Sequence, residues 1–417
     1  MSDSLSPAPV LAAPRPRPAL LALAYLAFVS LGLPDAVLGI AWPSIRGAFA
    51  LPQAALGAVL ATSAAAYFLS GLRAGQLIRS LGIGTLLTVS TGLVTLGIAG
   101  FSLAPAFAWF LLSACFIGVG SGGIDAGLNT YAARHFGARH MTWLHAAYST
   151  GAALGPVLLT AILARGGGWR AGYVTIGAVL GLLAVSFAVM RRQWGGEQAR
   201  SGAGEASDAS GPAAGDGVTP SISTGATLLR PRVWLQIFLF FFYSGVEVTT
   251  GQWSYTFLTE SRGIDTTVAG TWVSLYWGSL LAGRVLLGFI VERVGSVRLL
   301  RLCSGTAILG AILFAIPGIP AAIGLAIIGF SLAPIFPGLM SETPRRIGVE
   351  AAAHAVGFQV SAATLGVATL PSLAGLLSER FGLEVVAPMI AICAVLFTVL
   401  HEVLVAVSDR GTTAPAR

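Results

Sequence analysis

The sequence predicts an all-α membrane protein, and two properties of the chain indicate this fold class. Of its 417 residues, 55% are hydrophobic and only 10% are charged, whereas about 25% of the residues of a soluble domain carry charge. The apolar residues also gather into runs of about 20, the length that an α-helix needs to cross the hydrocarbon core of a bilayer. We therefore expect the lipid bilayer to surround most of the chain.

Twelve such runs follow one another, six before residue 191 and six after residue 232. They lie near 19–41, 53–75, 83–103, 106–131, 141–164, 169–190, 233–258, 266–290, 297–316, 319–341, 352–377 and 385–407. The stretch between the two sets is rich in Gly, Ser and Ala, which is typical of a flexible linker. The expected domains are a tail at 1–18, a six-helix bundle at 19–190, a linker at 191–232, a second six-helix bundle at 233–407 and a tail at 408–417.

The basic residues predict the orientation of these helices. The net charge of +7 comes from Arg alone, because the chain contains no Lys. If the N-terminal tail is cytoplasmic, 19 of the 24 basic residues lie at or near the cytoplasmic side. The five on the opposite side are Arg46, Arg165, Arg170, Arg262 and Arg380. This positive-inside bias predicts a multi-pass protein of the cell inner (plasma) membrane with both termini cytoplasmic. Because the basic residues follow the loops, we expect no nucleic-acid partner.

The first segment carries an acid at membrane depth, Asp35, directly after Pro34. A proline inside a helix frees a backbone carbonyl and kinks the helix, which suits the wall of a hydrated cavity. A carboxylate that is shielded from water binds a proton more readily than one in solution. Asp35 is therefore a candidate for the residue that carries a coupling proton.

The fourth segment carries a second acid, Asp125. At helical spacing Ser121, Asp125 and Asn129 share one face, and Gly118, Gly122 and Ala126 form a neighbouring face of small residues against which another helix can pack. An acid inside the membrane marks a transport or proton site by default. Asp125 is thus the other candidate proton carrier, with Asn129 as a substrate ligand. The alternative is a buried structural acid that is hydrogen-bonded to a neighbouring helix.

Segments 7 and 8 supply further candidate substrate ligands. Glu247 lies near the middle of segment 7, and Gln252 and Trp253 follow about one turn later. An amide can bond paired hydroxyls while an indole stacks on the C–H face of a pyranose, so this pairing suits a sugar site. Tyr276 lies on a stripe of segment 8 with Trp272 and Ser279, although an aromatic such as Trp272 is equally expected in an interfacial belt.

Two residues in the fifth and eleventh segments occupy corresponding places. Tyr148 lies seven residues before Gly155, and Gln359 lies seven residues before Gly366. If the two halves correspond, both side chains face a central cavity at equal depth. The alternative for Gln359 is a hydrogen bond between helices. Arg284 is expected to snorkel or pair near the cytoplasmic end of its helix. His145 is expected to have a structural role, with a proton relay as the alternative.

The loop after segment 8 identifies a family. It contains Gly288, Glu292, Arg293, Gly295 and Arg298 in the spacing Gly-x-x-x-Glu-Arg-x-Gly-x-x-Arg. This pattern resembles the signature loop of the major facilitator superfamily (MFS). The resemblance implies the MFS fold, with twelve helices in two six-helix bundles, and a structural and gating role for the five residues. The glycines permit a tight turn, and the acid can meet the N-terminus of a facing helix. The loop after segment 2 has Arg79 where the acid belongs.

The acids in the first and fourth segments narrow the resemblance to one group within the superfamily. From Gly32-Leu-Pro-Asp35 to segment 11, the chain is similar to the sugar:proton symporters of the fucose permease type. That group is known for an acid in the first helix and another in the fourth, and Asp35 and Asp125 occupy those places. The group also uses an amide in the fifth helix, where this chain has His145, Tyr148 and Ser149 but no Asn.

The resulting expectation is a transporter and not an enzyme, since no phosphate-binding loop, metal cluster or nucleophile elbow is present. The expected function is proton-coupled symport of a monosaccharide or similar small polar solute by alternating access. We expect a monomer that needs no cofactor beyond the coupling proton. The alternatives are a proton-driven efflux antiporter for drugs or metabolites, a facilitative sugar uniporter, and a non-transporting sensor or scaffold built on the same fold.

Overall fold

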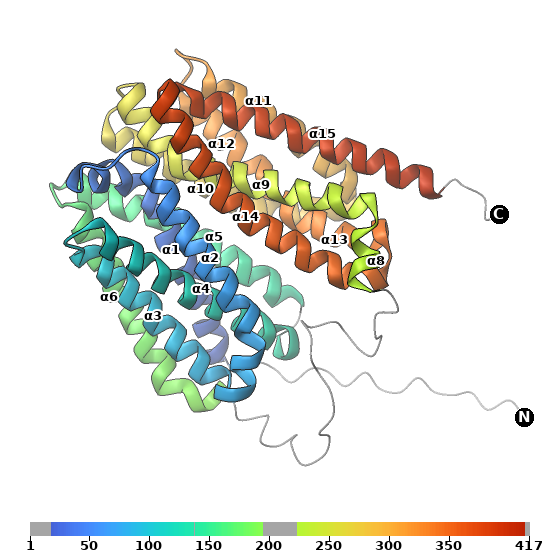
Figure 1. Ribbon diagram of the computed structural model, residues 1–417, viewed down its shortest axis with the longest axis horizontal. Coiled ribbons are helices and arrows are strands. Elements are labelled where there is room, and N and C mark those ends of the chain that lie inside the picture. Colours follow the sequence, from blue (N-terminus) through green and yellow to red (C-terminus); the bar gives the residue numbers. More distant parts are fainter. Residues whose placement is uncertain (1–17, 137, 195–222, 413–417) are drawn as a thin grey trace, which may run out of the picture.

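The chain is built from long helices packed side by side (Figure 1). The computed structural model describes residues 18–136, 138–194 and 223–412, and within these ranges it contains no strand. Twelve helical spans of the described residues are long and apolar enough to cross a membrane, which confirms the expected number. Most of the expected linker, 195–222, lies outside the described residues.

The membrane-spanning helices have the following bounds: α1 (Pro18–Ala48), α2 (Ala55–Leu81), α3 (Ile83–Leu103), α4 (Phe107–His135), α5 (Ala138–Ala164), α6 (Trp169–Met190), α9 (Pro231–Thr256), α10 (Thr266–Val294), α11 (Ser296–Ala315), α12 (Ala321–Leu332), α13 (Ile335–Ile347), α14 (Val349–Phe381) and α15 (Val386–Thr412). The short elements are η1 (Arg191–Trp194), α8 (Thr224–Leu228), η2 (Phe257–Ser261) and η3 (Leu383–Val385). The tenth span is broken between α12 and α13, where Pro334 has no N–H to continue the helix.

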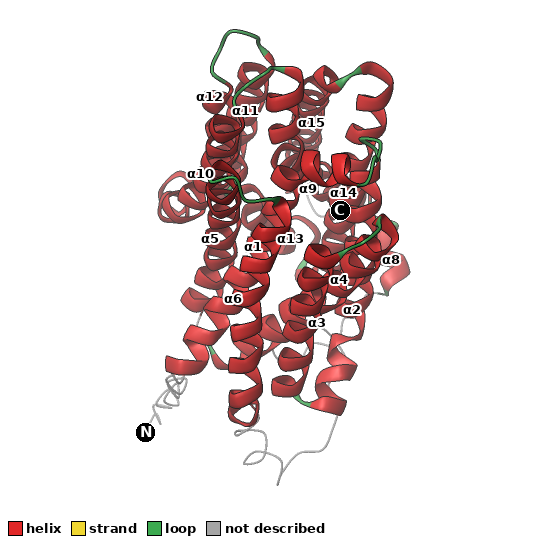
Figure 2. Cartoon of the chain, turned by 90° about the vertical axis from the view of Figure 1, so that its left-hand side faces the viewer, coloured by secondary structure: helices red, strands yellow, loops and turns green. Residues whose placement is uncertain are grey.

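The helices form two bundles with the same internal pairing, seen from two sides in Figures 1 and 2. In the first bundle α1 packs on α5, α2 on α4, and α3 on α4 and α6. In the second, α9 packs on α14, α10 on α12, and α11 on α12 and α15. Between the bundles α5 meets α10, α2 meets α14, and α1 meets α9. The repeated pattern is that of two structurally equivalent halves facing each other.

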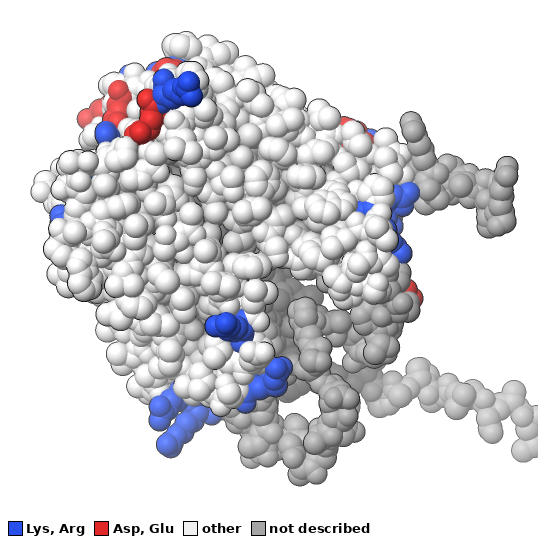
Figure 3. All heavy atoms as spheres, in the orientation of Figure 1, with Lys and Arg blue, Asp and Glu red and all other residues white. Residues whose placement is uncertain are grey.

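The two ends of the molecule differ in the number of arginines they carry and in how closely the two bundles approach each other. We call the end at which α1 finishes the Arg46 end, and the end at which α1 and α9 begin the linker end. Because successive spans alternate in direction, the five arginines expected on the far side lie at the Arg46 end. In Figure 3 charged atoms gather near the ends of the face shown, with few between them. The bundles converge at the Arg46 end and diverge toward the linker end (Figure 1).

Glycines allow the closest helix pairs to approach. A Cβ built on Gly32 of α1 would lie 2.0 Å from the carbonyl oxygen of Tyr148 in α5. A Cβ on Gly118 or Gly122 of α4 would lie 2.2 or 2.3 Å from a carbonyl oxygen of α2. The small face expected on the fourth segment is therefore a packing face. These contacts hold α5 on α1 and α2 on α4, and so they fix the tyrosines that reach the two acids.

Candidate functional site

Asp35 lies near the middle of α1 and is exposed rather than packed. Its Oδ2 accepts a hydrogen bond of 3.0 Å from the hydroxyl of Tyr148 in α5. Its backbone oxygen accepts a 2.8 Å bond from Nε2 of Gln252, which reaches across from α9 in the other bundle. The expected residues Asp35, Tyr148 and Gln252 are thus brought together at the junction of α1, α5 and α9. The hydrogen bond to the carboxylate comes from a neutral phenol and not from a cation.

Asp125 lies in α4 and is partly buried. Oδ2 accepts a 2.7 Å bond from the hydroxyl of Tyr67 in α2, and Oδ1 accepts a 3.0 Å bond from Nδ2 of Asn129 one turn along. The bond to Asn129 confirms that these two residues share one face. Tyr67 is a partner that the sequence analysis did not identify, and it also lies within electrostatic range of Asp35 and Tyr148. The two acids therefore belong to one continuous polar region of the first bundle.

The second bundle contributes a third polar group, centred on Glu247 of α9. Its Oε1 forms an ion pair of 3.3 Å with Nη2 of Arg284 in α10, and its Oε2 accepts a hydrogen bond from Tyr243. Nη1 of Arg284 donates a 2.5 Å bond to Oγ of Ser149, on α5 of the first bundle. The hydroxyl of Tyr276 donates a 2.7 Å bond to the backbone oxygen of Glu247. Glu247 and Tyr276 are thus neighbours, with Tyr276 fully buried, and their expected contact with substrate stays a prediction.

Arg284 was expected either to snorkel or to pair near the cytoplasmic end of its helix, and the structure shows it paired with Glu247. The sequence analysis did not identify that partner. The side chain also lies within electrostatic range of Tyr148 and His145. A guanidinium at membrane depth needs an anionic partner, and Glu247 on the neighbouring span was the available acid. That pairing was the signal that could have found it.

Gln359 and Trp253 lie inside the second bundle. Gln359 is fully buried, and its amide bonds to Gln236 of α9 and, at 3.0 Å, to the hydroxyl of Thr343 in α13. Nε1 of Trp253 donates a 2.9 Å bond to the carbonyl oxygen of Pro371, and its ring is also fully buried. Both side chains are fully buried in this conformation, so their expected contact with substrate stays a prediction.

The five residues of the expected gating loop lie at the linker end, where α10 turns into α11. Gly295 has a φ of +85°, a left-handed conformation that glycine adopts at low cost, and its N–H closes the helix on Val291. Gly288, Glu292, Arg293 and Arg298 are exposed. The expected tight turn is present, and its gating role remains a prediction.

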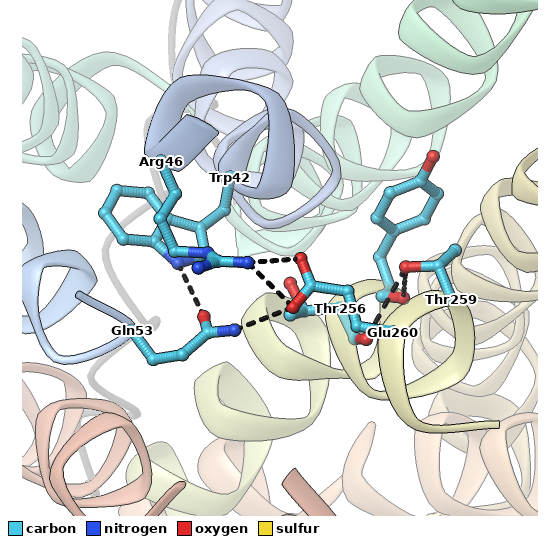
Figure 4. Close-up of polar contacts among 7 residues, drawn as sticks. Trp42, Arg46, Gln53, Thr256, Thr259 and Glu260 are labelled. Carbon is cyan, nitrogen blue, oxygen red and sulfur yellow. Dashed lines mark hydrogen bonds and ion pairs between the residues drawn. The ribbon is translucent and has the colours of Figure 1, made fainter. Parts of the chain in front are cut away.

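A polar cluster joins the bundles at the Arg46 end (Figure 4). Glu260 of η2 accepts two bonds of 2.9 Å from Nη2 of Arg46 and one of 2.8 Å from Nε2 of Gln53. Trp42 in turn donates a 3.2 Å bond to Oε1 of Gln53. Nearby, Oγ of Ser372 in α14 donates a 3.3 Å bond to the carbonyl oxygen of Gly57 in α2. Together with the Arg284 bond to Ser149, these contacts extend from the Arg46 end to the middle of the helices.

Comparison with protein families gives one result for most of the chain: residues 24–367 match the model described as Major Facilitator Superfamily. A curated relative in Saccharomyces cerevisiae (strain ATCC 204508 / S288c), Bypass of stop codon protein 6, is 25% identical over 187 residues, 41% of this chain and 37% of that protein. The Sodium-dependent glucose transporter 1 of Homo sapiens is 30% identical over 150 residues, 35% of this chain and 29% of that protein. The chain thus spans well under half the length of each.

Two solved structures are similar over nearly their whole length. A bacterial homologue of the human lysosomal transporter Spinster, inward-facing and unoccupied, has a TM-score of 0.73 at 14% identity, covering 95% of this chain and 98% of that one. The D-xylose-proton symporter has a TM-score of 0.72 at 15% identity, covering 92% and 96%. At such identity the likeness shows a shared fold.

Proposed function

The chain belongs to the major facilitator superfamily, and we propose that it carries a monosaccharide or similar small polar solute across the membrane together with a proton. Membership makes it a multi-pass membrane transporter and not an enzyme. The names of the human glucose transporter and the D-xylose-proton symporter support a sugar substrate. We place it in the cell inner membrane as a monomer, with no cofactor beyond the coupling proton.

The observation that carries the proposal is the environment of Asp35. Its carboxylate is exposed at the place where α1, α5 and α9 meet, and its side-chain partner is the neutral hydroxyl of Tyr148. A carboxylate at membrane depth with a neutral donor can take up and release a proton, whereas one locked to an arginine cannot do so easily. Glu247 is locked in that way by Arg284. Asp35 is therefore the proposed proton carrier, with Asp125 as the second.

The hydroxyls of a sugar have matching groups around Asp35. Tyr148 and Asp35 lie on the first bundle, and Glu247 and Arg284 lie opposite them on the second. Carboxylate oxygens accept hydroxyl protons, while the phenol and the guanidinium donate to hydroxyl oxygens. A small solute with several hydroxyls would therefore touch both bundles at once, which lets its binding bias their relative position.

The orientation follows from the arginines, because the linker end carries most of them and is proposed to be cytoplasmic. The bundles are then joined at the outer surface by Arg46, Gln53 and Glu260 and separate toward the cytoplasm. This arrangement is inward-facing. Transport would alternate it with an outward-facing state, reached by rocking one bundle against the other.

The experiment is a measurement of substrate-induced proton movement. Lightly buffered, de-energised cells that express the protein receive hexoses, pentoses and polyols in turn, and the external pH is recorded. One sugar is expected to raise the external pH, and Asp35→Asn is expected to abolish the rise. Glu402→Gln is the matched control, because it removes an exposed acid paired with Arg301 away from the site. If no sugar in the panel changes the external pH, and the cells instead lose hydrophobic cations in response to a proton gradient, symport would be refuted in favour of efflux. Sugar uptake without a pH change would indicate a uniporter.

A further inference from the structure

The ion pair between Glu247 and Arg284 lies in the wall of the proposed site. The two side chains are 12% and 18% exposed, so both border the space between the bundles without being free in it. The second nitrogen of Arg284 spans that space to reach Ser149. The guanidinium is thus held by an acid from its own bundle and by a hydroxyl from the other.

The charges around this pair are unbalanced toward the negative. Asp35 and Asp125 lie on the first bundle, and Asp125 and Arg284 are both close enough to His145 to affect it electrostatically. Glu247 already neutralises Arg284 at 3.3 Å. A solute that carries a carboxylate would therefore meet an occupied guanidinium on one side and, whenever Asp35 and Asp125 are deprotonated, two anions on the other. A neutral solute meets no such repulsion, and its hydroxyls can replace Ser149 as the partner of Arg284.

We propose that Glu247 determines the charge of the accepted substrate: by occupying Arg284 it admits neutral polyhydroxy solutes and excludes the corresponding carboxylates, such as uronic acids. This inference rests on the proposed function, since it assigns a specificity role within the same site. The negative charge of Glu247, rather than its shape, carries the effect.

Removing that charge has a definite consequence. In Glu247→Gln the amide keeps the size of the side chain and can still bond to Tyr243, but Arg284 loses its counter-ion. A guanidinium in a poorly hydrated site without an anion is costly. A uronic acid would supply the anion through two parallel N–H to oxygen bonds, a geometry that arginine favours. The variant should therefore gain affinity for uronic acids.

The test measures binding to the purified full-length protein by ligand-induced thermal stabilisation, using neutral hexoses and pentoses and the uronic acid of each hexose. The wild type is expected to prefer a neutral sugar over its uronic acid by about tenfold or more, and Glu247→Gln to reverse or abolish that preference. Glu247→Met, of similar volume and also uncharged, serves if the amide variant does not fold. Glu247→Asp retains the charge and should keep the wild-type preference.

Two controls separate charge from general damage. The double variant Glu247→Gln with Arg284→Gln removes both charges and should reject uronic acids again, while Glu402→Gln should behave as the wild type. A wild type that binds uronic acids as tightly as neutral sugars overturns the inference, as does a folded, uncharged variant at 247 that still excludes them. Failure of the proposed function would look different, because then no sugar of either kind would stabilise the wild type.

Discussion

Breaking the contact of Glu260 with Arg46 and Gln53 should shift the protein toward the state that is open at the Arg46 end. Glu260→Gln removes the charge that attracts Arg46 but keeps a side chain able to accept a bond from Gln53. Glu260 and Arg46 come from different bundles, and their bonds of 2.9 Å cross the interface. In the outward-facing state these residues must separate, so the bonds stabilise only the conformation described above.

The size of the shift follows from the exposure of the pair. Arg46 and Glu260 are 30% and 27% exposed, so water screens the pair only in part. Partly exposed ion pairs contribute up to about 1 kcal/mol, and the retained hydrogen bond offsets some of the loss. A change of about 1 kcal/mol alters the ratio of the two states by roughly fivefold.

The assay is the reactivity of a cysteine that the closed interface covers. Ser372→Cys is suitable, because Ser372 contacts Gly57 across the interface at the Arg46 end. The natural cysteines Cys115, Cys303 and Cys393 are first replaced. A membrane-impermeant maleimide applied from the outside should label this cysteine faster, by up to about fivefold, when Glu260→Gln is present.

The matched control is Glu384→Gln. Glu384 pairs with Arg262 at 2.6 Å at the same end, but both residues belong to the second bundle. Its loss should leave the labelling rate unchanged. Equal acceleration by both variants would mean that general loosening, and not the cross-bundle contact, exposes the cysteine. An unchanged rate with Glu260→Gln would refute the reasoning.

Three further outcomes are expected. Tyr148→Phe removes the hydroxyl that bonds to Asp35. It should slow proton-coupled uptake by roughly three- to tenfold and change how the uptake rate depends on pH. An unaltered pH profile would count against Asp35 as the proton carrier. Gly32→Ala places a methyl 2.0 Å from a backbone oxygen and should destabilise the protein by about 1–3 kcal/mol in thermal unfolding, whereas Gly92→Ala meets no atom within 4 Å and should not. Gln359→Leu leaves the buried hydrogen-bond partners of Gln359 unsatisfied and should cost about 1–3 kcal/mol of stability, with an unchanged KM. A raised KM would instead indicate that Gln359 contacts the substrate.

The fold could be predicted because its main signal, the length of apolar runs, does not depend on tertiary contacts. All twelve spans are present where the sequence placed them. The break before Pro334 went unnoticed, because the apolar run continues across the proline through Ile335 and Phe336. The superfamily followed from one loop, whose turn glycine Gly295 has the expected left-handed conformation.

The site was harder to predict, because the sequence indicates how deep a residue lies in the membrane but not how its helix is rotated about its own axis. A helix that faces lipid on one side and protein on the other is apolar on both, so periodicity does not show which side chains turn inward. Asp35 and Asp125 stood out only because acids are costly in lipid. Arg284 was expected to snorkel or to pair, but the sequence did not show that its partner is Glu247. Gln359 was found as a lone amide, yet its hydrogen-bond partners, Gln236 and Thr343, come from α9 and α13.

Glycines lie at three points where the bundles meet. Gly39 lies against the backbone of Gln252, Gly57 against Ser372, and Gly375 against Ala54. Each of these glycines brings only backbone to its contact, so no side chain of its own has to change rotamer when the bundles part. The polar bonds across the interface, such as those of Gln252 and Arg284, do have to break. A ligand with a few hydroxyls can form a similar number of hydrogen bonds. Its modest binding energy is therefore enough to shift the equilibrium between the two conformations of the whole protein.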